Sequence, residues 1–182
     1  MVMKTKAMTV EQFEEWVNQP ESTEHDYEFI AGEIVNVVTH PLSSKIAGKF
    51  LIHIGSFVYD KELGHVTGAD GGYQVGNERY MPDVGYISFA RQAILQSEAG
   101  YIPNAPDLAV EVVSPNDTPR QITVKVSNYL AAGTVVWVVY PDDEQVDIHI
   151  PSKPVHVVTK DDTLDGGTVL PDFKLKLGDI FK

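Results

Sequence analysis

The sequence contains no cysteine, which excludes disulfide bonds and thiolate metal ligands. It also has no apolar run approaching the roughly 20 residues that a membrane-spanning helix needs. Residues 1–10 lack the apolar segment of a secretory signal. We therefore expect a chain that folds by burial alone, in the reducing cytoplasm and without a membrane.

Basic residues are scarce, because 14 Lys and Arg face 26 Asp and Glu and leave a net charge of −12. A field of this sign opposes the approach of a nucleic acid. Residues 41–125 are closer to neutral, with 9 acidic and 7 basic residues, and salt screens more distant charges beyond about 8 Å. A groove holding Lys45, Lys49, Arg79 and Arg120 could therefore accept a phosphodiester.

Several common kinds of site have no support in the sequence. The 6 histidines show no close metal-ligand spacing. Neither a glycine-rich strand-to-helix motif nor the nucleophile elbow of serine hydrolases is present. The acidic stretch Pro141–Glu144 is typical of a solvated turn after a strand.

The length of 182 residues and the hydrophobic content of 43% suit one domain, residues 1–182, with a sizeable core. Periodicity and capping signals predict helices near 9–20, 43–64 and 118–133, the second capped by Ser43 or Ser44. Predicted strands lie at 27–30, 33–38, 65–69, 72–75, 80–87, 108–113, 134–140, 145–150 and 155–159. We expect 161–167 to be a loop and 170–181 to pack on the core. Residues 88–106 should form a long irregular segment, with a helical turn at 91–96, that is either a lid or a connector.

Two acids and one lysine are the candidate catalytic residues. Glu111 is embedded in the apolar run Leu108–Val113, and a carboxylate is costly to bury there unless a cation meets it. Strand alternation turns Glu111 to the face opposite Leu108. Lys125 lies at the edge of the apolar stripe of the next helix, where its ammonium can reach the strand end. With Asp83, which follows a proline at the start of another apolar strand, these residues would suit a hard divalent cation and a phosphate.

Each of these residues also has a simpler explanation. Glu111 could pair with a surface base, Lys125 could merely cover core surface with its aliphatic stem, and Asp83 could belong to a turn. The combination of all three in one chain favours a site.

The chain also carries a longer pattern of motifs. These are Tyr27–Val35, Met81–Val84, Asp107–Pro115, and Lys125 followed by Tyr129, Ala132-Gly133 and Val136–Val139. The pattern resembles the Uma-two family of restriction endonucleases, which is similar to the wider PD-(D/E)XK nuclease superfamily. The resemblance spans about residues 9–181, and its most specific part is Glu-Val-Val-Ser-Pro followed by Lys and Tyr.

This resemblance implies an α/β (α+β) fold of the restriction endonuclease-like type. A mixed central sheet would be flanked by helices at 44–61 and 119–132, with added N-terminal and C-terminal β-hairpins and a nuclease core at about 41–140. It also implies a metal site, in which Asp83, Glu111 and the Val112 carbonyl would hold Mg²⁺ or Mn²⁺. Lys125 would orient the attacking water, and Glu28 would be an auxiliary acid.

In this group the lysine that usually lies two residues after the acid has moved to the following helix: position 113 is Val, and Lys125 takes the role. Two positions depart from the family pattern. Lys45 stands where relatives often carry a histidine, and Gln121 stands where they often carry an acid.

The leading hypothesis is a metal-dependent endonuclease that acts on DNA, with a homodimer as a possible assembly. The alternative is a catalytically weak or inactive nuclease-fold protein that serves as a dimeric binding or regulatory module, which the acidity, Lys45 and Gln121 favour. A third hypothesis is a hydrolase that uses paired carboxylates on a sugar.

Overall fold

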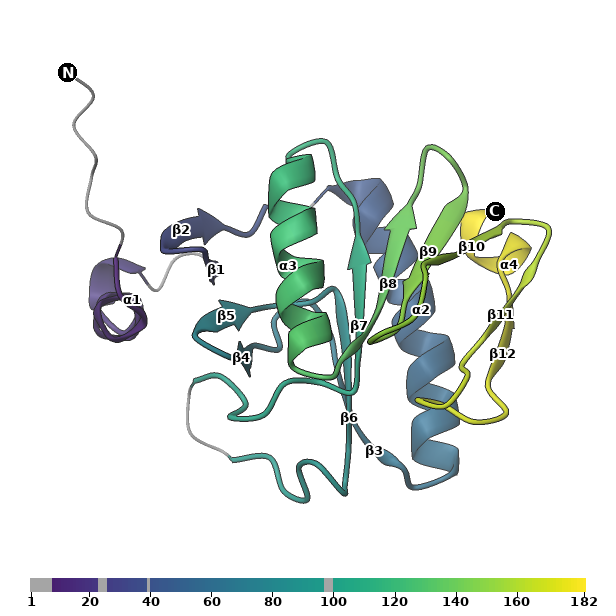
Figure 1. Ribbon diagram of the computed structural model, residues 1–182, viewed down its shortest axis with the longest axis horizontal. Coiled ribbons are helices and arrows are strands. Elements are labelled where there is room, and N and C mark those ends of the chain that lie inside the picture. Colours follow the sequence, from purple (N-terminus) through teal and green to yellow (C-terminus); the bar gives the residue numbers. More distant parts are fainter. Residues whose placement is uncertain (1–7, 23–25, 39, 97–99) are drawn as a thin grey trace.

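The computed structural model describes residues 8–22, 26–38, 40–96 and 100–182. A six-stranded sheet runs through it, with the strand order β10-β9-β8-β7-β6-β3 (Figure 1). Its strands are β3 (Gly64–Thr67), β6 (Val84–Ser88), β7 (Leu108–Val112), β8 (Val135–Tyr140), β9 (Gln145–His149) and β10 (His156–Thr159). Only β7 and β8 are parallel neighbours; the other pairs in this sheet are antiparallel. The carboxyl ends of β7 and β8 therefore lie at the same edge.

The parallel pair is the most deeply buried part of the sheet. All five residues of β7 and five of the six in β8 are buried, as is usual for parallel strands covered on both faces. Leu108 and Val110 belong to the core on one face, whereas Ala109 belongs to the core on the other. Glu111 therefore points to the same face as Ala109, as strand alternation predicts.

One long helix covers each face of the central sheet. Helix α2 (Pro41–Asp60) buries Ile46, Phe50 and Ile54 in one core. Helix α3 (Pro119–Ala131), which connects β7 to β8, buries Val126 and Tyr129 in the other. A capping box formed by Thr118 and Gln121, with proline at the first helical position, starts α3 as predicted. These two helices confirm the mixed sheet flanked by helices.

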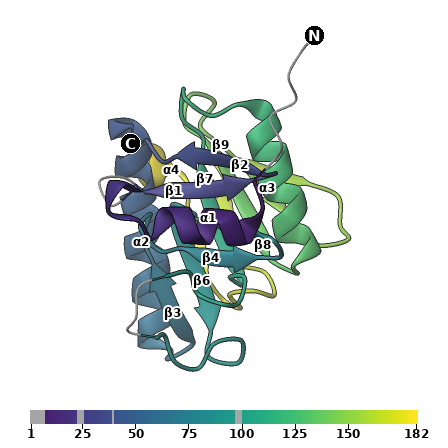
Figure 2. The same cartoon turned by 90° about the vertical axis from the view of Figure 1, so that its left-hand side faces the viewer.

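A second, four-stranded sheet covers the α3 side of the molecule. Its order is β2-β1-β5-β4, and its strands are β1 (Tyr27–Ile30), β2 (Glu33–Asn36), β4 (Tyr73–Val75) and β5 (Glu78–Tyr80). The predicted hairpin is present: Ala31 and Gly32 form its turn with φ of 51° and 85°, the positive values that a two-residue hairpin turn requires. Helix α1 (Val10–Val17) and the 3₁₀ turn η1 (Pro20–Ser22) precede it, and Figure 2 shows α1 beside β1 and β2.

The C-terminal segment completes the core on the α2 side. It contains β11 (Thr163–Asp165), β12 (Lys174–Lys176) and α4 (Gly178–Phe181). Several of its apolar side chains are buried against α2 and the sheet, namely Leu164, Leu170, Phe173, Leu175, Leu177 and Ile180. Lys49 of α2 donates hydrogen bonds to three carbonyl oxygens of this segment, at 2.7–3.0 Å.

Some predicted boundaries were wrong. The strand expected at 80–87 is divided between two sheets, because Pro82 has no N–H to donate and interrupts the ladder between β5 and β6. Helix α2 begins at Pro41 rather than at a serine cap, with proline in its first turn and His40 as its N-terminal flank.

The remaining differences lie in loops and at the sheet edge. Residues 161–167, expected to be a loop, contain β11, which gains its pairing from the distant β12. The helical turn expected at 91–96 is instead a turn at 89–91. The predicted C-terminal hairpin exists as β9 and β10, but it extends the central sheet rather than standing apart from it.

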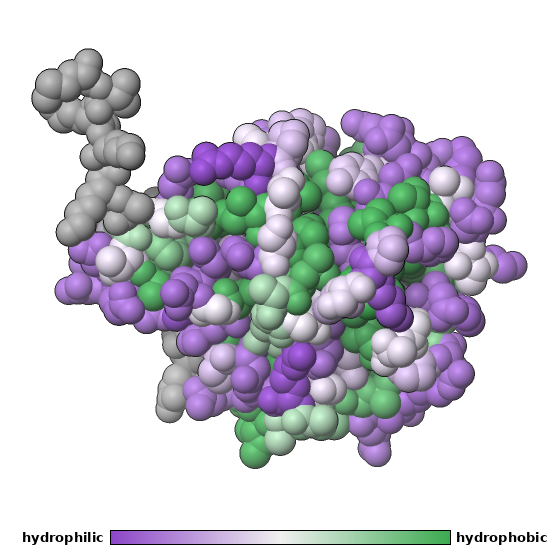
Figure 3. Space-filling view, in the orientation of Figure 1, coloured by the Kyte–Doolittle hydropathy of each residue, from purple (hydrophilic) through white to green (hydrophobic). Residues whose placement is uncertain are grey.

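The surface drawn in Figure 3 is largely hydrophilic at its margins, with apolar residues in separate patches. Within the described ranges, no helix is both long and apolar enough to cross a bilayer.

Candidate active site

The four acidic and basic side chains predicted from the sequence line one cavity. Glu28 comes from β1, Asp83 from the residue before β6, Glu111 from β7 and Lys125 from α3. The cavity has a volume of about 140 Å³ and lies beside the carboxyl end of β7. Val112, expected to offer its carbonyl, lines the cavity as well.

Lys125 links the two sheets through paired carboxylates. Its ammonium Nζ donates to Glu111 Oε2 at 2.7 Å and to Glu28 Oε1 at 2.8 Å. All three side chains are buried, with only 6% of each residue exposed. A buried cation with two charged acceptors is well compensated, and charge-assisted bonds of this kind are stronger than neutral ones.

Further donors hold the two glutamates in place. The Tyr129 hydroxyl donates to Glu111 Oε1 at 3.0 Å, and the backbone N–H of Met81 donates to Glu28 Oε1 at 2.7 Å. The ring of Tyr80 packs edge-on against Tyr129, and the Lys125 ammonium lies 5.6 Å from its centroid. Tyr129 thus belongs to the hydrogen-bond network as well as to the core stripe.

Asp83 contacts β7 from the start of its neighbouring strand, β6. Its Oδ2 accepts a hydrogen bond of 2.7 Å from the backbone N–H of Val112, the last residue of β7. In the described part of the chain, no donor hydrogen-bonds to Asp83 Oδ1 or to Glu28 Oε2. One oxygen of each carboxylate therefore remains able to accept a ligand.

The ionisation of the cluster reflects its excess of negative charge. Burial raises the pKa of Asp83 to about 6, and the Val112 N–H and Lys125 only partly oppose it. Burial also raises the pKa of Glu111 above its ordinary value, with Lys125 lowering it and Glu28 and Asp83 adding repulsion. Burial alone would lower the pKa of Lys125, but its attraction to Glu111 and Glu28 leaves that pKa above the ordinary value. The raised pKa of Lys125 requires ionised carboxylates beside it. Lys125 is therefore charged, and it is the one cation of the cluster facing several acids.

This donor set suits a divalent cation. Three carboxylates surround one ammonium at the cavity: Glu28 and Glu111 both pair with Lys125, whereas Asp83 has no ion pair among the described residues. Hard oxygen ligands are those that Mg²⁺ and Mn²⁺ prefer. In the ranges that the structure describes, no three His, Cys, Asp or Glu side chains come together as a ready metal site. A cation here would therefore need a backbone carbonyl, water or substrate oxygens besides two carboxylates.

The expected basic groove is absent from this cavity. Arg79 is buried and donates to Glu14, while Lys45 and Lys49 donate to carbonyl oxygens of the C-terminal segment. None of these residues, nor Arg120, is among the lining residues. Contrary to expectation, Lys45 offers no contact to a phosphate at this site, because its ammonium donates to the C-terminal segment instead.

Two other expectations concern neighbouring residues. Gln121 lines the cavity, but its side-chain oxygen accepts hydrogen bonds from Thr118 in the helix cap, at 3.0 Å from the backbone N–H and 2.6 Å from the hydroxyl. The described residues of 88–106 do not line the cavity. Arg91 holds that segment at the amino end of β7, through Pro106 O at 2.8 Å and Asp107 at 3.3 Å. A lid over the site is therefore not supported.

The sugar-hydrolase hypothesis finds no support either. A sugar site usually offers aromatic side chains as a platform, and no Phe, Tyr or Trp lines this cavity within the described ranges. The ammonium of Lys125 also lies between Glu28 and Glu111, the pair that would have to flank a glycosidic bond.

Sequence reasoning missed two contributors to the site. The Tyr129 hydroxyl could have been anticipated, since Tyr129 lies four residues after Lys125 on the same helical face. The Met81 N–H could not, because a backbone donor has no signal in the side-chain pattern.

The mixed central sheet flanked by helices gives the chain a restriction endonuclease-like fold. A family model described as "Putative restriction endonuclease" matches residues 10–178. The chain therefore belongs to this family, Uma2 (Uma-two), as the motifs predicted.

A solved structure supports the fold assignment. It is described as a putative nuclease belonging to DUF820 from Anabaena variabilis, and it has a TM-score of 0.83 and 22% sequence identity to this chain. The similarity covers 96% of this chain and 97% of that chain, and at this identity it shows a shared fold. No curated protein matches the sequence.

Proposed function

We propose that the protein is a metal-dependent endonuclease that hydrolyses phosphodiester bonds of DNA. The observation that carries this proposal is the meeting of Asp83, Glu111 and Lys125 in one cavity where carboxylates outnumber the single ammonium. Membership of a family described as restriction endonucleases supports DNA as the substrate. A DNA substrate in turn favours the cytoplasm as the compartment, and cutting both strands favours a homodimer.

The metal would be held by Asp83, Glu111 and the Val112 carbonyl. Both carboxylates line the cavity, and a Mg²⁺ site of one or two carboxylates completed by water and phosphate oxygens is common in enzymes of phosphate chemistry. When bound, Mg²⁺ or Mn²⁺ supplies Lewis acidity, which polarises a phosphoryl oxygen and lowers the pKa of a bound water.

Lys125 would act as a hydrogen-bond donor rather than as a base. The two glutamates raise its pKa, so it stays protonated at neutral pH and cannot remove a proton from water. Its ammonium already has two acceptors and lies in a buried setting where charge interactions are strong. A third donor position can meet the attacking water or the phosphate as negative charge develops there.

Glu28 and Tyr129 would position these groups. Glu28 fixes Lys125 from the second sheet, and the Tyr129 hydroxyl orients the Glu111 carboxylate. Water would attack the phosphorus and release one proton to solvent, the bond to the leaving sugar oxygen would break, and that oxygen would take up a proton from solvent. Buried, hydrogen-bonded groups limit the reorganisation that this step needs.

One observation favours a second candidate, a nuclease-fold module that binds without cutting. The basic residues expected to receive DNA lie outside the cavity, and among the described residues that line it Lys125 is the only Lys or Arg. Under this alternative the buried ion pairs would be structural.

Cleavage of supercoiled plasmid and of single-stranded DNA with Mg²⁺ or Mn²⁺ would distinguish the two. Native protein would be compared with Glu111→Gln and Lys125→Met, and with the exposed controls Glu15→Gln and Lys174→Met. We expect metal-dependent cleavage that both site variants lose and both controls keep. No cleavage by folded native protein with either metal and either substrate would favour the binding module.

A further inference from the structure

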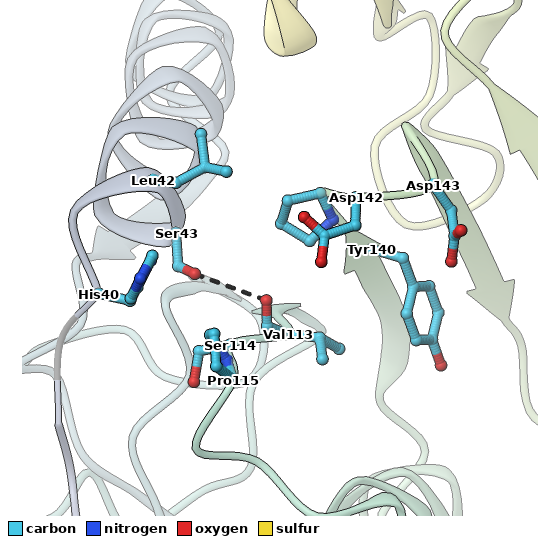
Figure 4. A pocket seen from close by; sticks show the side chains of 10 residues that line it. His40, Leu42, Ser43, Val113, Ser114, Pro115, Tyr140, Asp142 and Asp143 are labelled. Carbon is cyan, nitrogen blue, oxygen red and sulfur yellow. Dashed lines mark hydrogen bonds between the residues drawn. The ribbon is translucent and has the colours of Figure 1, made fainter.

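A second cavity adjoins the candidate active site. It has a volume of about 220 Å³, and it shares His40, Ser43 and Ser114 with the first cavity. Figure 4 shows that its walls come from the start of α2 on one side and from the end of β8 on the other. The two cavities are therefore neighbouring compartments along the same edge of the central sheet.

The floor of this second cavity is the chain that leaves β7. Val113 continues the parallel ladder, since its N–H donates to Val139 O at 2.9 Å. Its carbonyl oxygen accepts a bond of 3.5 Å from the Ser43 hydroxyl of α2. Val113 follows Glu111 by two residues, which is about 7 Å along an extended strand. A group bound here would thus lie about 7 Å from the proposed reaction centre.

The chemistry of the walls selects against phosphate. Asp142 and Asp143 are acidic side chains among the lining residues, and the part of the chain that the structure describes contributes no Lys or Arg to these walls. In Figure 4 the Asp142 carboxylate is directed toward the space between β8 and α2, whereas the Asp143 carboxylate is directed away from it. Leu42, Pro115 and the half-buried Tyr140 supply apolar surface.

An uncharged planar group that carries an N–H donor fits these walls. Its faces would contact the apolar and aromatic surface, and its donor would meet the Asp142 carboxylate. The volume is below the 300 Å³ or more of typical drug-sized pockets, which suits a fragment such as one nucleobase. Carboxylates accept hydrogen bonds from exocyclic amino groups, cytosine N4 among them.

We propose that this cavity, the base pocket, holds the base of the nucleotide next to the scissile phosphate and that Asp142 accepts a hydrogen bond from its amino group. The inference rests on the proposed nuclease function and adds a specificity determinant to it. A base stacked in a duplex cannot place its faces between the pocket walls, so the nucleotide must be unpaired or extruded. Thymine has no amino group, and its N3–H lies between two carbonyl oxygens that repel a carboxylate, so it should bind least well of the four bases.

The test uses four single-stranded oligonucleotides that differ only at the nucleotide beside the mapped cleavage position, which is cytosine, adenine, thymine or abasic. Native protein is compared with Asp142→Ala and with the matched control Asp143→Ala, which removes the neighbouring carboxylate. We expect kcat/KM to be about tenfold higher for cytosine or adenine than for thymine or the abasic site. Asp142→Ala should reduce this preference below twofold, and Asp143→Ala should keep it.

Two results separate failure of this inference from failure of the nuclease proposal. Cleavage without preference, or a preference that Asp142→Ala keeps, would overturn the base pocket and leave the nuclease standing. If no oligonucleotide is cleaved, the same set is labelled and its binding is measured by fluorescence anisotropy in EDTA. A preference in affinity that only Asp142→Ala removes would then support the pocket in a binding protein, and equal affinities would overturn it.

Discussion

Replacing Asp83 with asparagine should make the metal-free protein more stable while abolishing its activity. Burial raises the pKa of Asp83 from an ordinary value of 3.8 to about 6. The folded protein therefore holds the proton of this carboxyl more tightly than the unfolded chain does. Such a group adds stability below pH 3.8, and that stability is lost as the pH rises through about 6.

The size of the effect follows from the shift. A difference of about 2 pH units corresponds to about 3 kcal/mol at pH values above 6, at about 1.4 kcal/mol per unit. Asparagine is nearly isosteric, and its side-chain oxygen can still accept the Val112 N–H that Asp83 accepts at 2.7 Å. In a chain of this size, 1 kcal/mol moves Tm by about 2–4 °C, so Asp83→Asn should raise Tm by about 6–12 °C.

Thermal unfolding of both proteins in EDTA, from pH 4 to pH 8, would measure this difference. The two melting temperatures should nearly coincide at pH 4 and separate progressively between pH 4 and 6. Adding Mn²⁺ at pH 8 should raise the Tm of the native protein and leave the variant unchanged, because a ligand stabilises the state that binds it. An equal or lower Tm for Asp83→Asn at pH 8, or a difference that does not shrink at low pH, would refute the buried-carboxylate reasoning.

Further variants test the rest of the site and the core. Lys125→Met should destabilise the fold by about 3–5 kcal/mol in urea titration, because two buried glutamates lose their cation; the exposed Lys174→Met should change stability by less than about 0.5 kcal/mol. Tyr129→Phe should cost about 1–3 kcal/mol and lower the cleavage rate, since Glu111 Oε1 loses a donor. Trp137→Ala should cost about 3–5 kcal/mol by opening a cavity in the buried core. The cleavage rate of native protein should fall about tenfold per pH unit below about 6, because protonated Asp83 cannot hold the metal.

The central part of the fold was predictable because its patterns are local. The continuous apolar runs of β7 and β8 indicated buried parallel strands, and the cap at Thr118 indicated the start of the helix between them. The direction of Glu111 followed from alternation within a single strand. Each of these signals lies within a few residues, so no distant contact was needed to interpret it.

The parts that were not predictable depend on partners far away in the sequence. Lys45 contacts a residue 137 positions away, and Lys125 contacts Glu28 over a separation of 97 positions. The division of 80–87 between two sheets is similar, because apolar residues continue on both sides of Pro82 and only the pairing partners differ. Family resemblance alone pointed to Glu28, since its own strand reads as an ordinary hairpin.

The way the charges are distributed in the site itself favours a ligand there. Lys125, Tyr129 and the Met81 N–H all donate to Glu28 or Glu111, so the second sheet and α3 compensate those two glutamates. Asp83 receives one backbone N–H and keeps an oxygen at the cavity, where burial raises its pKa. An amide at this position would give a more stable metal-free fold. The half-buried Asp83, which costs stability and borders a cavity, therefore supports the proposal that a cation binds there and offsets the cost.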